Sequence, residues 1–295
     1  MTSQFQMISE IGDRLKSYRL GTGLSPEDVA KKTGISVASI YRYEAGKPIR
    51  VDALGKIADL LDISLASLFG VGSENIASAV TFFERLRQIE AEADQITVLF
   101  GPVPYLLTSD SYDELLPQVL LESVPDIAAN RGGLESSISQ LIEILLSRKK
   151  AFKKRKPNII ALISALELEQ FVRSGFVGST NLNPNEIDIR RKAAVLEVQN
   201  VIYLLKEQPI GIQIGVVQDS MPGTSFQILR KGTNAQVATS PFRLGTSANV
   251  RIGVATITSA REAIKLHQSV TENLWKHSLK GEAAATALEK LLQEF

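Results

Sequence analysis

The chain has 295 residues, with 33 Lys and Arg against 32 Asp and Glu, no Cys, and a hydrophobic fraction of 44%. This composition predicts a soluble protein with enough residues for two domains, and it argues against an intrinsically disordered chain. Without Cys there is neither a disulfide framework nor a thiolate metal site, and two His leave little for a histidine metal cluster. We therefore expect a cytoplasmic protein with no metal and no cofactor.

The charge and the N-terminus exclude further classes. Residues 1–19 lack the succession of basic, apolar and small residues that marks a signal peptide, and no run of about 18 apolar residues occurs in the chain. No membrane partner is expected. The formal net charge of +1 gives no global attraction to nucleic acid, so any contact with DNA must come from local placement of charge.

Residues 11–70 contain short helical segments separated by glycine turns. Ser25 is a predicted N-cap, and Pro26 takes the first helical position, where its missing N–H costs nothing. A turn at Gly34 ends this helix, and Ser36 begins the next one. Two short helices joined by a tight turn predict a helix-turn-helix unit.

The second helix of such a unit lies in the major groove of DNA. Ile40 and Tyr43 are expected to point inward. Arg42 is the best candidate for reading a base, because a guanidinium can donate two hydrogen bonds to guanine O6 and N7, for about 1–3 kcal/mol of discrimination. The expected DNA-binding residues are Ser25, Ser36, Val37, Ala38, Ser39, Tyr41, Arg42, Lys47 and Arg50, of which Ser25, Ser39, Lys47 and Arg50 are expected at phosphates. Helix-turn-helix geometry also occurs in bundles that do not bind DNA, where these side chains are only solvated.

Four segments carry a family resemblance: LKSYR at 15–19, LSPEDVA at 24–30, GISVASIYRYEAGK at 34–47 and LGKIADLLDISLASLF at 54–69. Together they resemble the Cro/C1 (XRE) helix-turn-helix family of DNA-binding regulators. The resemblance implies that Arg19 and Glu44 form a partly buried ion pair between the first helix and the end of the recognition helix. It also implies operator binding as a dimer on two half-sites. Pro26 departs from the family, since many relatives have Gln there as a phosphate contact.

Residues 71–100 follow as a predicted connecting helix. Phe82, Leu86, Ile89 and Ala93 form an apolar stripe at helical spacing. This stripe packs either against the second domain or along a dimer seam. The first interpretation is favoured, because the stripe is shorter than the heptads of a secure coiled coil.

Residues 101–295 change character from helical to mixed. A long helix is predicted over 185–208, followed by period-two alternation over 210–216. Further strands are predicted over 225–229, 236–239 with 242–244, and 250–255. The short turns between these strands favour antiparallel pairing of neighbours. Ser259 is the predicted N-cap of a last helical region. The predicted fold is multidomain: an all-α helix-turn-helix domain at 1–70, the connecting helix at 71–100, and an α+β sensor or dimerisation domain at 101–295 with a mainly antiparallel sheet.

A basic run occupies residues 148–156, where seven of nine residues are Lys or Arg. It is a candidate for contact with operator-flanking phosphates or with an acidic partner. The alternative is a solvated helix end whose cations complement the helix dipole. The candidate contact residues are Lys149, Lys150, Lys153, Lys154, Arg155 and Lys156.

The C-terminal domain carries a second, partial resemblance. The segments FERLRQIEAEAD at 83–94, VPYLLTSDSY at 103–112 and SFQIL at 225–229 resemble WhiJ-like regulators, although Tyr105 stands where those often have Gly. This resemblance implies a domain that senses an effector or binds a partner.

Motifs of nucleophilic hydrolases, P-loop enzymes, zinc proteases and dinucleotide-binding enzymes are missing from the sequence, so no enzyme is expected. The predicted function is a dimeric transcriptional regulator of double-stranded DNA whose C-terminal domain responds to a small-molecule or protein effector. One alternative is a phage-type repressor or antitoxin-like autoregulator that holds a protein partner. Another is a ligand-binding or hydrolytic protein with an accessory helix-turn-helix.

Overall fold

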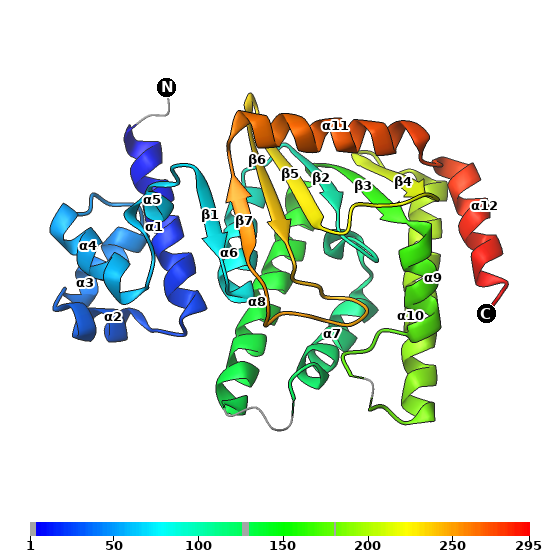
Figure 1. The fold of residues 1–295 in the computed structure, drawn as a ribbon, viewed down its shortest axis with the longest axis horizontal. Helices are drawn as coiled ribbons and strands as arrows, with labels where there is room; N and C mark the ends of the chain where they lie inside the picture. The colour runs from blue at the N-terminus through cyan, green and yellow to red at the C-terminus, as the bar shows by residue number, and fades with distance from the viewer. Residues whose placement is uncertain (1–3, 126–129, 180) are drawn as a thin grey trace.

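The computed structural model describes residues 4–125, 130–179 and 181–295. It shows a helical N-terminal unit beside an α+β body (Figure 1). The helices of the N-terminal unit are α1 (Gln4–Gly21), α2 (Pro26–Thr33), α3 (Val37–Glu44), α4 (Val51–Leu60) and α5 (Leu65–Phe69).

Local signals place the helix-turn-helix as predicted. The Ser25 hydroxyl accepts the Asp28 N–H at 3.0 Å, and Pro26 is the first residue of α2. Gly34 ends α2 in the left-handed conformation with φ 71°, which a residue with a Cβ rarely adopts. Ser36 then caps α3 by accepting the Ser39 N–H at 3.2 Å.

The body contains a seven-stranded mixed sheet in the order β1-β7-β6-β5-β2-β3-β4. Its strands are β1 (Ser73–Ile76), β2 (Gln95–Leu99), β3 (Asn158–Ser164), β4 (Ile212–Val217), β5 (Ser225–Lys231), β6 (Asn234–Ser240) and β7 (Ala255–Thr258). Only the β2–β3 and β3–β4 pairs are parallel. The predicted class, a helical domain followed by an α+β domain with a mainly antiparallel sheet, is therefore confirmed.

Helices cover both faces of this sheet (Figure 1). The larger core contains residues from α6 (Ala79–Glu90), α7 (Asp110–Glu122), α8 (Arg131–Arg155), α9 (Ala165–Ser174) and α10 (Pro184–Glu207), with a 3-10 turn at Tyr105–Leu107. On the other face, Ile264, Leu274 and Trp275 of α11 (Arg261–His277) pack on a smaller core that includes Leu162 and Phe226. The last helix, α12 (Gly281–Leu292), packs against α10.

Residues 71–100 are not a connecting helix, and this prediction needs correction. Only 79–90 are helical, and the flanking strands β1 and β2 belong to the sheet. Phe82 and Leu86 of the apolar stripe are fully buried in the chain's own core. The stripe therefore packs within the molecule, and its buried residues do not form the dimer seam that was the alternative.

Other differences concern strand limits and missed strands. Within the stretch predicted at 250–255, only Ala255 is in a strand, and residues 242–244 contribute a single bridge. The last helical region begins at Arg261 after Ala260, which makes no side-chain cap, so Ser259 is not its N-cap. Strands β2 and β3 were missed because residues buried on both faces show no alternation.

Candidate nucleic-acid interface

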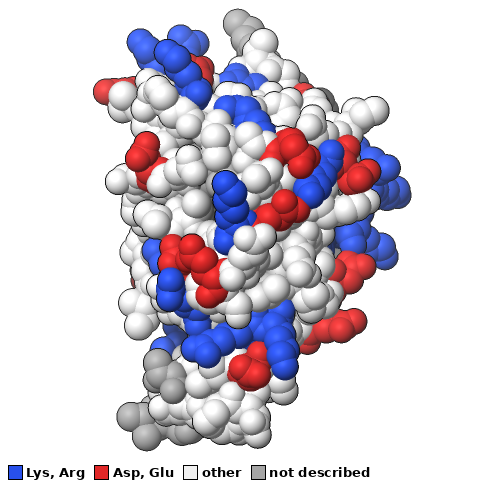
Figure 2. All heavy atoms as spheres, turned by 90° about the vertical axis from the view of Figure 1, so that its right-hand side faces the viewer, with Lys and Arg blue, Asp and Glu red and all other residues white. Residues whose placement is uncertain are grey.

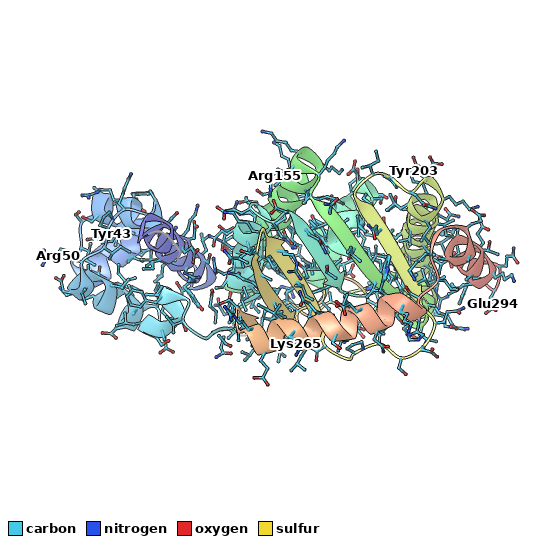
Figure 3. The ribbon with its side chains drawn as sticks, turned by 90° about the horizontal axis from the view of Figure 1, so that it is seen from above. Tyr43, Arg50, Arg155, Tyr203, Lys265 and Glu294 are labelled. Atoms are coloured by element: carbon cyan, nitrogen blue, oxygen red, sulfur yellow. The ribbon has the colours of Figure 1, made fainter. Side chains whose placement is uncertain are left out.

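Helix α3 turns one face to the core of the N-terminal unit and leaves the other open. Ile40 is fully buried and Tyr43 is 8% exposed, as the spacing predicted. Ala38, Tyr41 and Arg42 lie on the open face, while Val37 and Ser39 are half-buried, and Val37 packs partly against the core. The unit that carries Tyr43 and Arg50 projects from one end of the molecule (Figure 3). The C-terminal domain therefore does not cover the open face of α3.

The three serines that were predicted to contact DNA, Ser25, Ser36 and Ser39, make hydrogen bonds at the starts of α2 and α3. The Ser25 hydroxyl donates to Asp28 Oδ2 at 2.7 Å while it accepts the Asp28 N–H. The hydrogen bonds that the Ser25 hydroxyl and the Ser25 N–H donate to the Asp28 carboxylate lower the pKa of Asp28. The Ser36 and Ser39 hydroxyls lie 2.8 Å apart. A phosphate at this surface would meet hydroxyls that are already oriented by the caps.

The predicted DNA-facing cations differ in their partners. Within the described part of the chain, Arg42 and Lys47 are exposed and make no ion pair. Arg50 donates two hydrogen bonds to Asp52, at 3.0 and 3.1 Å, in an exposed pair that is worth little in water. Tyr41 donates its phenolic hydrogen to Glu27 Oε1 at 3.2 Å. Arg42 and Lys47 are therefore the cations most available to an anionic partner.

The ion pair that the family resemblance implied is present. Arg19 Nη2 donates to Glu44 Oε2 at 2.9 Å, and both side chains are 7% exposed. Arg19 Nη1 also donates to the Leu24 carbonyl at 2.8 Å. Since Glu44 is the last residue of α3, this contact ties the recognition helix to α1 and to the loop before α2.

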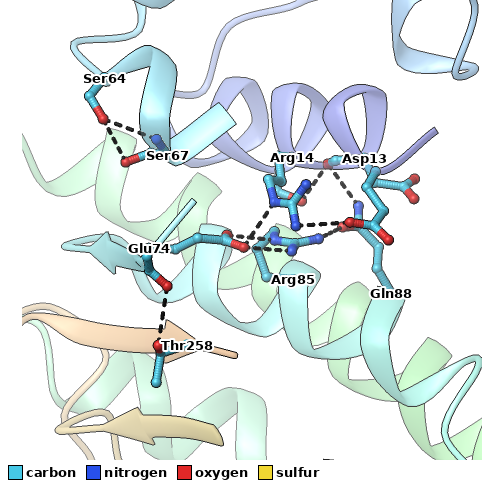
Figure 4. A network of polar contacts seen from close by, with 11 residues as sticks. Asp13, Arg14, Ser64, Ser67, Glu74, Arg85, Gln88 and Thr258 are labelled. Carbon is cyan, nitrogen blue, oxygen red and sulfur yellow. Dashed lines mark hydrogen bonds and ion pairs between the residues drawn. The ribbon is translucent and has the colours of Figure 1, made fainter. Parts of the chain in front are cut away.

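A second buried ion network joins the two domains (Figure 4). Glu74 of β1 accepts hydrogen bonds from Arg14 Nε of α1 at 2.9 Å, and from Arg85 Nε and Nη2 of α6 at 2.9 and 2.8 Å. All three residues are 4% exposed. Burial disfavours the charged carboxylate, but Arg85 and Arg14 outweigh it and hold the pKa of Glu74 below its ordinary value. Nothing in the local sequence pattern marks Glu74 for this role.

The basic run at 148–156 divides into buried and exposed positions. Arg148 donates to Glu90 at 2.8 and 2.7 Å and is 3% exposed. Lys149 is also 3% exposed, so the prediction that it contacts phosphate or a partner is wrong. The physical reason is helical geometry: α8 buries one face, and these two positions lie on it.

The remaining cations of the run lie at the end of α8. Arg155 donates to the carbonyls of Glu90 at 2.9 Å and Ala93 at 3.2 Å, near the end of α6. Lys153 pairs with the exposed Asp110. Exposed cations without an ion pair in the described residues are Lys150, Lys154 and Lys156. Arg155 therefore binds carbonyls at the end of α6 and not those of its own helix, and contact with a partner stays a prediction for the exposed lysines.

Lys149→Ala is expected to destabilise the protein by about 1.5–3 kcal/mol, because Lys149 Nζ donates to Thr108 Oγ1, the Ser109 carbonyl and Asp113. Burial lowers the pKa of Lys149, as expected for an internal cation. Guanidinium unfolding of the full chain measures the change. The exposed neighbour provides the control, since Lys150→Ala should stay within about 0.5 kcal/mol of the parent. Equal effects of the two changes would contradict the internal role.

Charge on the opposite end of the molecule is mixed. Figure 2 shows Lys and Arg interspersed with Asp and Glu on the face that includes α9, α10 and α12. A face of mixed sign produces no strong field of its own for a polyanion.

Among the described residues, none of the helices combines the length and the apolar run that a bilayer crossing requires.

Comparison with known proteins supports the interpretation of the N-terminal unit. Residues 15–68 match the family model described as Helix-turn-helix. Among solved structures, TrmBL2, an archaeal chromatin protein described as having a novel mode of DNA binding, is 11% identical over 91% of this chain and 93% of its own, with a TM-score of 0.34. That TM-score does not establish a shared fold. No curated protein matches the chain, and the resemblance of the C-terminal domain to WhiJ-like regulators stays a prediction.

The match and the geometry agree on the same residues. The matched segment includes α2, the turn at Gly34 and α3, and its open face carries Arg42. These findings support a DNA-binding regulator. Residues 15–68 thus match the helix-turn-helix family model over a segment whose helices and turn have that geometry.

Proposed function

We propose that this protein is a transcriptional regulator that binds a double-stranded DNA operator through α3. The observation that carries the proposal is the contrast between the two sides of that helix. Its inner side is held by Ile40, Tyr43 and the Arg19–Glu44 pair, whereas Arg42 on its outer side has no partner in the described residues. A rigid helix with an unengaged guanidinium is suited to a two-pronged contact with guanine.

The working form in this proposal is a homodimer. One helix-turn-helix domain contacts a single half-site, and two-fold related domains reach half-sites about one helical turn apart. The C-terminal domain, which is much larger than the reading unit, would assemble the pair and respond to an effector. The exposed lysines of α8 are candidates for flanking phosphates.

We assign no catalytic role to the protein and no cofactor. One serine–carboxylate contact, from the Ser109 hydroxyl to Glu197, lies at the start of α7. The same hydroxyl accepts the Tyr112 N–H and caps the helix. Its geometry therefore has a structural explanation that requires no substrate.

Arg42→Ala is expected to relax the preference for one base pair in each half-site by about 1–3 kcal/mol, because only direct contacts with base edges carry sequence information. The measurement is genome-wide footprinting of parent and variant, followed by binding titrations on single-base operator variants. Lys47→Ala provides the matched control: loss of a phosphate contact should weaken all sequences alike and reduce the salt slope by about 1. If Arg42→Ala left site preference unchanged, another residue would be reading the base.

A further inference from the structure

A cleft of about 180 Å³ lies where the helix-turn-helix domain meets the C-terminal domain. One wall comes from α1 and includes Glu10, Asp13 and Arg14, and a second comes from α6 and includes Arg85 and Gln88. The hairpin of β5 and β6 closes the third side. The cleft is thus lined by both domains, next to the buried ion network of Figure 4.

Among the described residues, most hydrogen-bond donors around this cleft are engaged, although Arg14 Nη1 is buried without a partner. Arg14 and Arg85 both donate to Glu74, and Arg14 donates in addition to Glu10 at 3.2 Å. Gln88 Nε2 donates to the Asp13 carbonyl at 3.0 Å. These contacts leave the two guanidinium charges balanced by carboxylates.

Two cations of the hairpin, Arg230 and Lys231, border the cleft. Lys231 donates to Glu92 at 2.6 Å. Arg230 borders a second cleft on the α11 face of the sheet, together with Ile228. Because alternate residues of a strand point to opposite faces, its side chain belongs to that other face.

Two acceptors at the cleft are left without donors. The side-chain carboxylate of Asp13 makes no hydrogen bond or ion pair within the described residues, and the Oε1 atom of Gln236 is shielded from solvent without a donor. Burial raises the pKa of Asp13, and the nearby Arg85 charge opposes this only in part. A half-buried carboxylate and an amide oxygen in one cleft call for a partner that brings N–H donors and positive charge.

We propose that this cleft binds a small organic cation, an aliphatic amine or guanidinium compound, whose N–H groups donate to the Asp13 carboxylate and, after the Gln236 side chain rotates into the cleft, to Gln236 Oε1. An ammonium group would supply both the missing donors and the missing charge. Asp13 belongs to α1 of the DNA-binding domain and Gln236 to β6, so the bound cation contacts both domains. The role of the cation rests on the proposed function. Because it contacts both domains, the cation acts as an effector that biases the orientation of the helix-turn-helix domain.

The binding test uses the full chain without DNA. Isothermal titration with 1,4-diaminobutane, agmatine and butylamine is compared with neutral 1-butanol and anionic butyrate. The amines should bind, and the neutral and anionic compounds should not. Asp13→Asn should weaken amine binding at least tenfold, whereas Asp59→Asn, an exposed carboxylate of α4, should leave it unchanged.

A second variant and a separate titration complete the test. Gln236→Leu keeps a side chain of similar size without the acceptor and should weaken amine binding several-fold. Equal binding of 1-butanol and butylamine, or unaltered binding by both variants, would overturn the proposal. Operator affinity is measured afterwards with and without 1,4-diaminobutane. If the protein binds amines through Asp13 but fails to bind DNA, the cation site is supported and the proposed regulator is overturned.

Discussion

Glu44→Ala is expected to destabilise the N-terminal domain by about 3–5 kcal/mol, because it leaves the Arg19 guanidinium buried without its counter-charge. Arg19 and Glu44 are each only 7% exposed, and their contact joins α1 to the end of α3. The remaining hydrogen bond from Arg19 to the Leu24 carbonyl does not replace a carboxylate. The recognition helix should lose its fixed orientation together with stability.

Hydrogen exchange of the α1 and α3 amides in the full chain measures this effect. A loss of about 3 kcal/mol corresponds to exchange at least a hundredfold faster. The matched control is Asp52→Ala, which breaks an ion pair of the same domain whose side chains are 80% and 59% exposed. That change should cost less than about 1 kcal/mol. Similar protection losses in both variants would show that burial of the Arg19 pair contributes nothing.

Glu74→Ala is expected to cost at least about 3–5 kcal/mol, since the Glu74 carboxylate is the buried counter-charge that the Arg14 and Arg85 guanidiniums share. Arg14 Nη1 already lacks a hydrogen-bond partner in the described residues, so no acceptor is in place at that atom to replace the carboxylate. Guanidinium unfolding with circular dichroism measures the loss. Glu92→Ala is the control, because Glu92 pairs with Lys231 at the same junction but is 64% exposed. An effect of Glu74→Ala as small as that of the control would contradict the assigned role.

The same carboxylate predicts a pH dependence. Its pKa is lower in the folded protein than the ordinary value of 4.5, so its stabilising contribution is complete above that value. The contribution falls as the pH drops through the lowered pKa, where the folded carboxylate takes up its proton. Acid unfolding of the parent should therefore include a component below pH 4.5 that Glu74→Gln lacks. Unfolding free energies measured between pH 7 and pH 3 test this difference.

These predictions separate two ways in which one chain uses buried charge. The Arg19–Glu44 pair orients α3 within its domain, whereas Glu74 attaches that domain to the sheet through Arg14 and Arg85. The cleft proposed for a cation lies beside the second network and not the first. An effector there would act on the attachment of the domain, while the surface of α3 stays intact.

Short-range patterns were sufficient for the helix-turn-helix domain. The cap at Ser25, the glycine at Gly34 and the inward positions of Ile40 and Tyr43 all depend on residues a few positions apart, and the structure has them where the spacing predicts. The long helix α10 and the presence of strand β4 follow the same logic, because each is read within one element; β4 nevertheless begins at Ile212, its burial does not alternate, and Ile210 is exposed. Such features depend on the geometry of a single turn or strand.

Long-range packing determined the rest. The parallel β2–β3–β4 segment of the sheet joins residues more than fifty positions apart, and strands buried on both faces lack a period to read. Arg148 and Lys150 look alike in a basic run, yet one is buried against Glu90 and the other is solvated. Glu74 became a junction residue only because β1 lies beside α1 and α6 where these two helices pack together. Burial and charge pairing of this kind depend on which distant elements meet, and local sequence carries no record of that.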